Sequence, residues 1–343
     1  MNRNITYRLH IFLFLLPALI LFCTILIAPI FISFRDSLYS FSNFTGSDKQ
    51  YVGLTEGTTV DGTEVDEAGN DIESNYDKLF KKYLPDGKSK NPKYIGDALI
   101  TAFILAALST FIQLPIALAI ALCLGKGIRG ERTYLTIFFM PVLISTVIIG
   151  QLWFKIYDPK GVLNAFLQAL GIDKPIFQWI KDGSGSTSPF PFTGQWLAKG
   201  FGNTALIASF IPVLWQYIGY HALLMYAGVK GVPADLLEAA RLDGCTEGQI
   251  NRHIIIPYIK PILRVSVIFA VTGSLKSFDL FQTMFGRDND PAVSVPSMLL
   301  YRFTSLSNEY GLGSAVAVIL IILCFVFALL INLLFRNKGD KVA

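Results

Sequence analysis

The residue types that most often perform chemistry in proteins are few and scattered in this chain of 343 residues. Its three histidines and four cysteines show neither the spacing of a metal site nor that of a CxxC redox pair. Three of the cysteines lie in apolar runs, where cysteine behaves as a small hydrophobic residue. We therefore expect no catalytic residue, no metal site and no cofactor bound by this chain.

One short run has the ending of a phosphate-binding loop. Gly87-Lys88-Ser89 matches the last three residues of the pattern GxxxxGK[ST], but Lys82 stands where that pattern needs a glycine. No strand precedes the run, so the glycine-rich cradle for phosphates is missing. If the function of this chain depends on ATP, another chain must hydrolyse it.

Polar and aromatic residues inside two apolar runs are the better candidates for a functional site. Such residues are costly in a membrane and tend to face a bundle interior or a cavity. Aromatic faces beside hydroxyl groups suit sugar rings, although tryptophan and tyrosine also serve as interfacial or packing residues. Lys276 and Asp279 are three residues apart, so on a helix they would share a face and could form a structural pair. The residues selected as candidates to line a substrate pathway, called the pathway residues below, are Trp215, Tyr217, Gly219, Tyr220, Ser274, Lys276, Ser277 and Asp279.

The segment 231–261 predicts two short helices joined by a turn. Pro233 suits a helix start, and the residues up to Leu242 have high helix propensity. Gly244 predicts a C-terminal cap or sharp turn, and Thr246 with Gln249 predicts a capping box for the second helix. Four residues could give the pair an apolar face for a partner: Leu236, Leu237, Ala240 and Ile250.

The amino-acid composition indicates the environment in which these elements lie. The chain is 52% hydrophobic and 16% charged, whereas a soluble domain carries about a quarter charged residues. The net charge of +4 is modest and does not indicate nucleic acid as a partner. We predict an all-α, polytopic transmembrane helical bundle with six spans. The predicted spans are 9–34, 97–124, 134–156, 203–229, 262–281 and 312–335.

The first apolar run could be a signal peptide or a retained span. It is longer than the apolar region of about 7–15 residues in signal peptides. It also ends in Pro29 and bulky residues, with no small-x-small cleavage pattern. We therefore expect an uncleaved first span.

Basic residues in short loops orient the bundle. They cluster before the first span (Arg3, Arg8), between the second and third spans (Lys126, Arg129, Arg132) and in the tail. The positive-inside rule puts all three on the cytoplasmic side, and with them both termini and the loop 230–261. The acidic segment 36–96 would lie outside, with a flexible insert at 55–74. The predicted parts are 1–35 (N-terminus and first span), 36–96, a five-helix transmembrane domain at 97–335 and a tail at 336–343.

The loop between the fourth and fifth spans resembles the EAA loop of ABC importer permeases. Glu238, Ala239 and Ala240 are followed by Gly244 and then by Ile254 and Ile256-Pro257, at the spacing of that motif with one Ile for Leu. The runs LWQYIGYHALLMYAGVKGVP and FLLPALILF, and the pair Phe278-Asp279, are similar to the carbohydrate-type, maltose-permease-like members. The resemblance covers roughly residues 10–335.

Two departures from that pattern lie on the predicted outer side. Tyr51 to Leu54 and Asn75-Tyr76 form one run in the family but are separated here, as though residues 55–74 were inserted. A Gly-Gly-Pro loop is replaced by the longer GRDNDP at 286–291. Both changes affect where a binding protein would dock, and therefore the partner and the solute.

The resemblance implies a multi-pass protein of the bacterial cytoplasmic membrane, in contact with membrane lipid. It implies a second, homologous permease subunit, two ABC ATPase subunits that bind ATP-Mg, and an extracytoplasmic solute-binding protein. Each EAA helix would sit in a cleft of an ATPase, whose closure drives alternating access. The residues implied in this coupling are Glu238, Ala239, Ala240, Asp243, Gly244, Ile254 and Pro257.

Three other functions remain as alternatives. A secondary transporter or channel would need no EAA loop and often shows internal repeats, of which we find none. A membrane-embedded enzyme would need clustered Asp, Glu or His inside the spans. A permease for amino acids, phosphate or another non-carbohydrate solute would share the EAA loop, and only the LW-x-x-IGY run and the Phe-Asp pair favour carbohydrate over it.

Overall fold

The structure is a computed structural model that describes residues 3–54, 74–81, 95–158, 161–171, 204–285 and 294–336. The predicted insert 55–74, apart from Ser74, falls outside the described residues, as do the loop 286–291 and the phosphate-loop-like run 87–89. The chain divides into one unit of residues 1–89 and 299–321 and another of residues 90–298 and 322–343. Each unit is described by itself.

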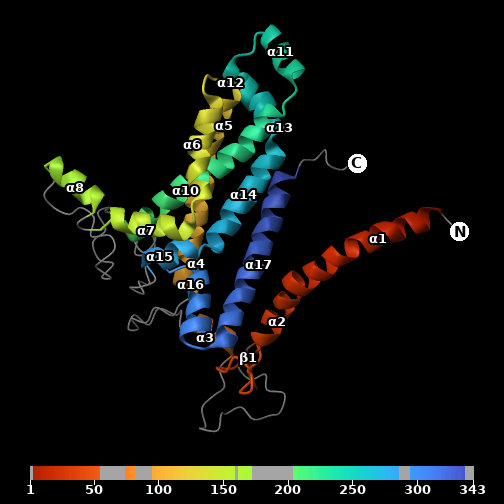
Figure 1. The fold of residues 1–343 in the computed structure, drawn as a ribbon, viewed down its shortest axis with the longest axis vertical. Helices are drawn as coiled ribbons and strands as arrows, with labels where there is room; N and C mark the ends of the chain where they lie inside the picture. The colour runs from red at the N-terminus through yellow and green to blue at the C-terminus, as the bar shows by residue number, and fades with distance from the viewer. Residues whose placement is uncertain are drawn as a thin grey trace. The chain divides into compact units, whose positions relative to one another are not determined.

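The first unit contains the predicted first span and a small polar segment after it. α1 (Arg3–Phe22), the π-helical turn η1 (Cys23–Ile27) and α2 (Ala28–Asp36) follow one another without a break (Figure 1). The side chains from Ile11 to Leu26 that the structure describes are largely exposed within the unit, as expected for a helix surrounded by lipid or by another subunit. The polar segment contributes β1 (Tyr39–Ser40), β2 (Gln50–Tyr51) and α3 (Asn75–Lys81).

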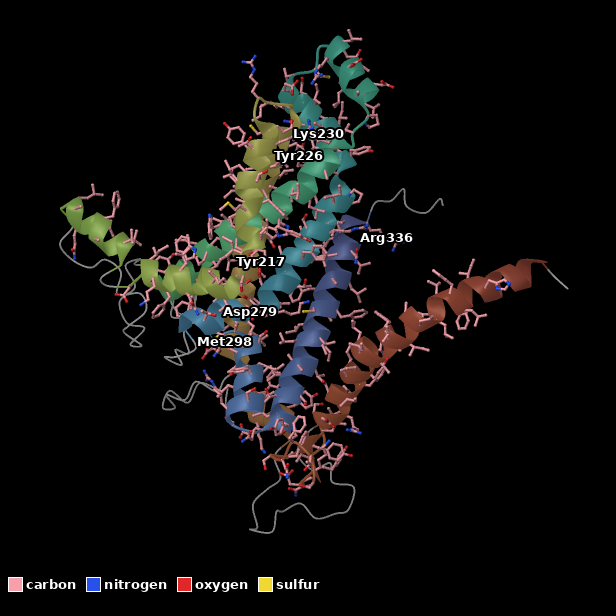
Figure 2. All side chains as sticks on the ribbon, in the orientation of Figure 1. Tyr217, Tyr226, Lys230, Asp279, Met298 and Arg336 are labelled. Carbon is pink, nitrogen blue, oxygen red and sulfur yellow. The ribbon has the colours of Figure 1, made fainter. Side chains whose placement is uncertain are left out.

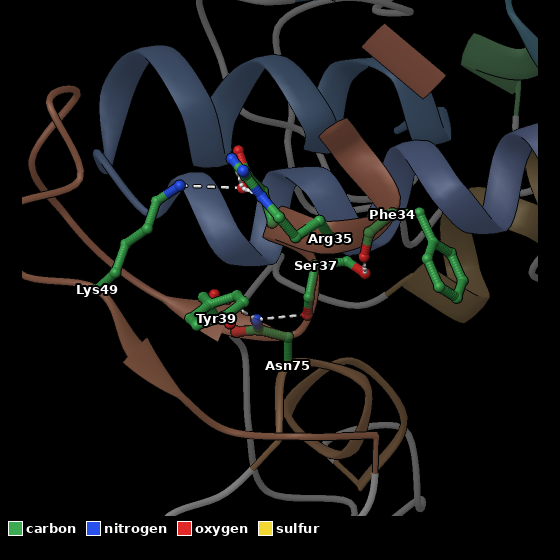
Figure 3. Close-up of polar contacts among 7 residues, drawn as sticks. Phe34, Arg35, Ser37, Tyr39, Lys49 and Asn75 are labelled. Atoms are coloured by element: carbon green, nitrogen blue, oxygen red, sulfur yellow. Dashed lines mark hydrogen bonds and ion pairs between the residues drawn. The ribbon is translucent and has the colours of Figure 1, made fainter. Parts of the chain in front are cut away.

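The polar segment is folded around hydrogen bonds, and its antiparallel pair of two-residue strands corrects the all-α prediction in this detail. Tyr39 pairs with Tyr51 and Ser40 with Gln50. Asn75 donates hydrogen bonds to the carbonyl oxygens of Ser37 (2.8 Å) and Tyr39 (2.9 Å), as Figure 3 shows. Asp36 forms ion pairs with Lys49 (2.9 Å) and Arg35 (3.0 Å).

Two further sets of hydrogen bonds stabilise the polar segment. The Ser74 hydroxyl donates a hydrogen bond to the carbonyl oxygen of Leu54 (3.1 Å), so the residues on the two sides of 55–73 are in contact. Asp48 accepts hydrogen bonds from the amides of Ser42 and Asn43 and from the Ser42 hydroxyl. These bonds favour the charged carboxylate and lower the pKa of Asp48 to about 2.

The second unit is a helical bundle. Its elements are α4 (Ile95–Leu108), η2 (Ser109–Gln113), α5 (Leu114–Gly125), α6 (Glu131–Leu143), α7 (Thr146–Ile156), α8 (Val162–Ala169), α10 (Thr204–Lys230), α11 (Ala234–Leu242), α12 (Glu247–Ile250), η3 (Asn251–Ile255), α13 (Ile256–Tyr258), α14 (Lys260–Leu275) and α15 (Asp279–Phe285). Three elements toward the C-terminus are divided between the two units, with residues 299–321 in the first: α16 (Pro296–Tyr301), η5 (Arg302–Leu306) and α17 (Tyr310–Phe335). α10 packs along both α5 and α6, α14 packs on α4, and α15 packs on α7 (Figure 1).

The described residues contain four helices that are long and apolar enough to cross a membrane. They are His10–Asp36, Ile95–Gly125, Lys260–Phe285 and Tyr310–Phe335. α6 and α7 pass the same test only together and are bent by 93° against each other, which would give a fifth. The span predicted at 134–156 corresponds to this bent pair, in which Ile144 and Ser145 adopt extended backbone that ends α6. The predicted count of six is not established by these helices.

Prolines inside the apolar helices coincide with wider turns. The π-helical segments η1, η2 and η3 each end two residues before a proline, at Pro29, Pro115 and Pro257. Proline has no N–H to donate and its ring crowds the carbonyl of the preceding turn. A π-turn relieves that crowding without ending the helix, as membrane helices require.

Candidate functional site: an internal cavity and an exposed loop

A cavity of about 470 Å³ lies within the second unit. This volume falls in the range of small-molecule sites, about 300–1,000 Å³. Its walls come from α4 and η2, from both sides of the α6–α7 bend, from α10, and from α14 with the link to α15. The lining residues are Leu105, Ser109, Gln113, Val142, Thr146, Val213, Tyr217, Tyr220, His221, Phe269, Ala270, Gly273, Ser274, Lys276, Ser277, Phe278, Asp279 and Leu280.

The cavity brings together six of the eight predicted pathway residues. Tyr217 and Tyr220 enter from α10, and Ser274, Lys276, Ser277 and Asp279 enter from the end of α14 and the start of α15. Figure 2 labels Tyr217 and Asp279, which lie in the same region of the bundle. Two separate apolar runs of the sequence thus contribute to one site.

The other two predicted residues, Trp215 and Gly219, are not in the cavity wall. Trp215 lies edge-to-face against Trp153, with ring centroids 6.2 Å apart. Gly219 lies against the backbone of α6, where a Cβ would be 1.8 Å from the carbonyl oxygen of Phe138. Both residues pack α10 against its neighbours.

The predicted helical pairing of Lys276 with Asp279 is also wrong. α14 ends at Leu275 with Lys276 as its C-terminal cap, and α15 begins only at Asp279, so the two residues do not share a helical face. The structure describes both side chains and gives no ion pair between them. Each is exposed at the cavity wall, so the site offers two opposite charges that a ligand or water can reach.

Sequence reasoning missed the contribution of α4 and η2. Ser109 and Gln113 are buried polar residues of the second apolar run, and the Ser274 hydroxyl lies 3.5 Å from that of Ser109. The polarity of these two residues inside an apolar run could have indicated that they line the cavity. His221, which was not among the selected residues, also lines the cavity; it is 4% exposed, and its Nδ1 atom has no hydrogen-bond partner.

The exposed loop 231–259 has the predicted helix–turn–helix form. Gln249 donates its amide to the Thr246 hydroxyl, and Thr246 donates its amide to the Gln249 side chain at 2.7 Å, which confirms the capping box. Gly244 has φ +76°, the left-handed conformation of a C-terminal cap, as predicted. The amides of Gly244 and Cys245 bond to the carbonyls of Arg241 and Ala240, which completes a Schellman motif.

The two sides of α11 face different surroundings. Leu237 and Ala240 face inward and pack, with Ile250, in a cluster with Val229 and Ile259. Of the four residues predicted to form an apolar docking face, only Leu236 is exposed, because the loop uses the others for its own core. The outward side carries Asp235, Glu238, Ala239 and Leu242 at helical spacing, and Leu242 is 89% exposed.

The remaining residues predicted for coupling differ in exposure. Asp243, Gly244 and Pro257 are exposed, whereas Ile254 is half-buried against the same inner cluster. Ala240 is buried, so its contribution is to packing. The accessible part of the predicted set is therefore Glu238, Ala239, Asp243, Gly244 and Pro257.

Residues 103–339 match the family described as binding-protein-dependent transport system inner membrane component. The chain belongs to this family. The "Probable ABC transporter permease protein YurN" of Bacillus subtilis (strain 168) is 28% identical over 96% of this chain and 97% of its own length. The diacetylchitobiose uptake system permease protein NgcF of Streptomyces coelicolor is 30% identical over 71% of this chain and 67% of its own length.

Solved structures agree on the fold. A chain of a bacterial ABC transporter involved in the import of the acidic polysaccharide alginate matches 98% of this chain and 98% of its own length, with a TM-score of 0.69 and 18% identity. This likeness extends over both described units. The family match over residues 103–339 confirms the resemblance expected from the EAA loop.

Proposed function

We propose that the chain is the permease subunit of an ATP-driven importer for a sugar, an oligosaccharide or a related carbohydrate. Family membership supports the transport class. The names of the relatives support the solute class: besides the diacetylchitobiose permease, they include the multiple sugar-binding transport system permease protein MsmF of Streptococcus mutans. The cavity offers two tyrosine rings beside serine and glutamine side chains, which suits hydroxyl-rich rings with apolar faces.

The observation that carries the coupling proposal is the outward side of α11. The side chains of Glu238 and Leu242 are exposed on a loop whose helices are already capped and packed, so the surface offered to a partner is preformed. We assign this surface to an ABC ATPase subunit, and we expect two such subunits that bind ATP-Mg. A second homologous permease subunit would complete the pathway, because one chain contributes only one EAA loop.

The proposed topology keeps six spans. α10 is the sixth, since 27 residues at a rise of about 1.5 Å each exceed the roughly 30 Å of a hydrocarbon core. The bent pair α6–α7 counts as one span. The basic residues Lys126, Arg129 and Lys230 then share the cytoplasmic side with the exposed loop, and both termini lie there too.

The proposed mechanism is alternating access to the cavity. Closure of the ATPases moves the loop, and the bundle opens the cavity to the outside, where a solute-binding protein delivers its ligand. One related structure is titled as a complex with an alginate pentasaccharide-bound periplasmic protein, which supports such a partner. The folded polar segment around β1 and β2 is the surface we assign to that contact.

Charge reversal at Glu238 tests the coupling proposal. Glu238→Lys is expected to abolish ATP-driven uptake and to lose the ATPase subunits in a pull-down, while the amount of inserted chain stays unchanged. Arg252→Glu is the matched control, since it reverses an exposed charge of the same loop outside α11 and is expected to retain both. Normal uptake by Glu238→Lys would refute the role given to this surface.

A non-carbohydrate solute is the second candidate, and two observations favour it. Lys276 and Asp279 present unpaired opposite charges at the cavity wall, which would suit a zwitterionic solute. The osmoprotective compounds uptake permease protein GgtC of Synechocystis is 31% identical over 69% of this chain. Uptake of labelled oligosaccharides and of zwitterionic osmolytes by the assembled importer decides between the two classes. Uptake driven by an ion gradient alone would instead indicate a secondary transporter.

A further inference from the structure

α6 is fastened to α10 beside the exposed loop. Glu131, the first residue of α6, accepts a hydrogen bond from the Tyr226 hydroxyl and forms an ion pair with Lys230 at 3.1 Å. Tyr226 and Lys230 are neighbours on the last turns of α10, as Figure 2 shows, and the Lys230 Nζ lies 5.6 Å from the centre of the tyrosine ring. One carboxylate therefore binds two side chains of α10 immediately before the loop begins.

The two helices also touch midway, through their backbones. A Cβ on Gly219 would lie 1.8 Å from the Phe138 carbonyl oxygen and 3.0 Å from the Phe139 Cα. Small residues permit this kind of close approach between membrane helices. No side chain stands between α6 and α10 at this point, so sliding would bring backbone atoms into collision.

A third connection holds the bend at the far end of α6. The Gln216 side chain donates to the Thr146 hydroxyl at 3.1 Å and lies 3.5 Å from the Ile144 carbonyl oxygen. Gln216 is 3% exposed, and separating the helices here would leave its amide without a partner in an apolar setting. The polar contact thus resists separation where α6 turns into α7.

These three connections join two walls of the cavity. Tyr217 and Tyr220 on α10 line it, and so do Val142 and Thr146 on the two sides of the α6–α7 bend. We infer that α6 and α10 move as one body during transport, and that Glu131 is the positioning residue that makes α6 follow the loop. The inference rests on the proposed coupling function. It adds that one displacement of the loop moves both walls together.

A cross-link tests whether the two helices stay together. The four native cysteines are unpaired, so they are first replaced by serine, and Glu131→Cys with Lys230→Cys is then introduced into the assembled importer. Without cross-linker, this variant is expected to consume roughly threefold or more ATP per solute imported, within the range that mutations in coupling networks produce. A short bis-maleimide that joins the two cysteines is expected to restore the parent ratio.

Each outcome separates this inference from the proposed function. If the cysteine-free parent shows no ATP-driven uptake with its ATPase pair, the proposed function fails. If the parent transports but the cross-linked variant stops, α6 and α10 must separate during the cycle and the inference is overturned. If the variant without cross-linker consumes as much ATP per solute imported as the parent, Glu131 does not position α6 for coupling and that part of the inference is overturned. Single-cysteine variants treated with the reagent control for simple modification.

Discussion

The close approach of α6 and α10 predicts a large effect from the smallest possible substitution, Gly219→Ala. The added methyl group would lie 1.8 Å from a backbone oxygen, about 1.2 Å short of the 3.0 Å below which real Cβ contacts essentially never fall. The obstructing atoms belong to the Phe138 peptide, so no side-chain rotation relieves the clash. The helices must therefore move apart by about 1 Å.

The energy follows from two opposing terms. Overpacking in a tight interface costs about 1–3 kcal/mol, and a rigid backbone contact belongs at the upper end. Alanine gains back about 1 kcal/mol through its higher helix propensity. The net expectation is a loss of about 2 kcal/mol, with a further loss where the separation weakens the Gln216 contact to Thr146.

Thermal unfolding of the detergent-solubilised importer measures this loss. Gly219→Ala is expected to lower the melting temperature by several degrees, and the variant to lose uptake. Gly273→Ala is the matched control, because it also lies inside a helix but no atom lies within 4 Å of its added Cβ. An unchanged or raised melting temperature in Gly219→Ala, alongside the same result for Gly273→Ala, would refute the close approach.

Three further outcomes are expected. The pKa of Asp48 is lowered to about 2 from 3.8, so its contribution to the stability of the polar segment is complete above about pH 4 and is lost as the pH falls toward 2. Hydrogen–deuterium exchange of the peptide 39–51, corrected for the intrinsic rate, should therefore rise as the pH falls from about 4 to about 2. The same exchange should not respond to pH in Asp48→Asn. Thr246→Ala removes the capping box and should weaken the second loop helix by about 1 kcal/mol, seen as faster proteolysis, whereas Thr246→Ser should not. A cysteine at the exposed Ser47 should react with an impermeant thiol reagent in intact cells, while the exposed Cys245 should react only after lysis; the reverse pattern would invert the topology.

The exposed loop was the most predictable part of the chain because its signals are local. Pro233, Gly244 and Thr246 with Gln249 each act within a few residues, through backbone conformation and capping bonds. The direction in which each residue of α11 points was not predictable in this way. It depends on the cluster with Val229 and Ile259, which neighbouring parts of the chain supply.

The bend at Ile144 and the helix end at Leu275 were not predicted, for the opposite reason. Apolar runs such as 134–156 show composition, and composition does not say where a helix stops. The bend at Ile144 is held by Gln216, about 70 residues away in the sequence. The stop at Leu275 likewise separates Lys276 from Asp279, although their spacing alone suggested a shared helical face.

The cavity was predicted in part. Its residues from α10 and α14 stood out as polar groups in apolar runs, and six of the eight selected residues line it. Gly219 was among the selected residues, but it lies in the backbone contact with Phe138 and not in the cavity wall. Ser109 and Gln113 reach the cavity through the packing of α14 on α4, which no short-range pattern reveals.

The division of α11 into an inward and an outward side has a consequence for how such a protein can change over time. Positions such as Leu237 and Ala240 are constrained by folding, because they pack in the core of the loop. Glu238 and Leu242 alternate with them along the same turns, but they are exposed and are constrained only by the partner proposed to dock there. Selection can therefore rewrite the outward positions without destabilising the loop. If an ATPase subunit docks there as proposed, a lineage could exchange that subunit for another, or share one ATPase among several permeases, without a change in the bundle.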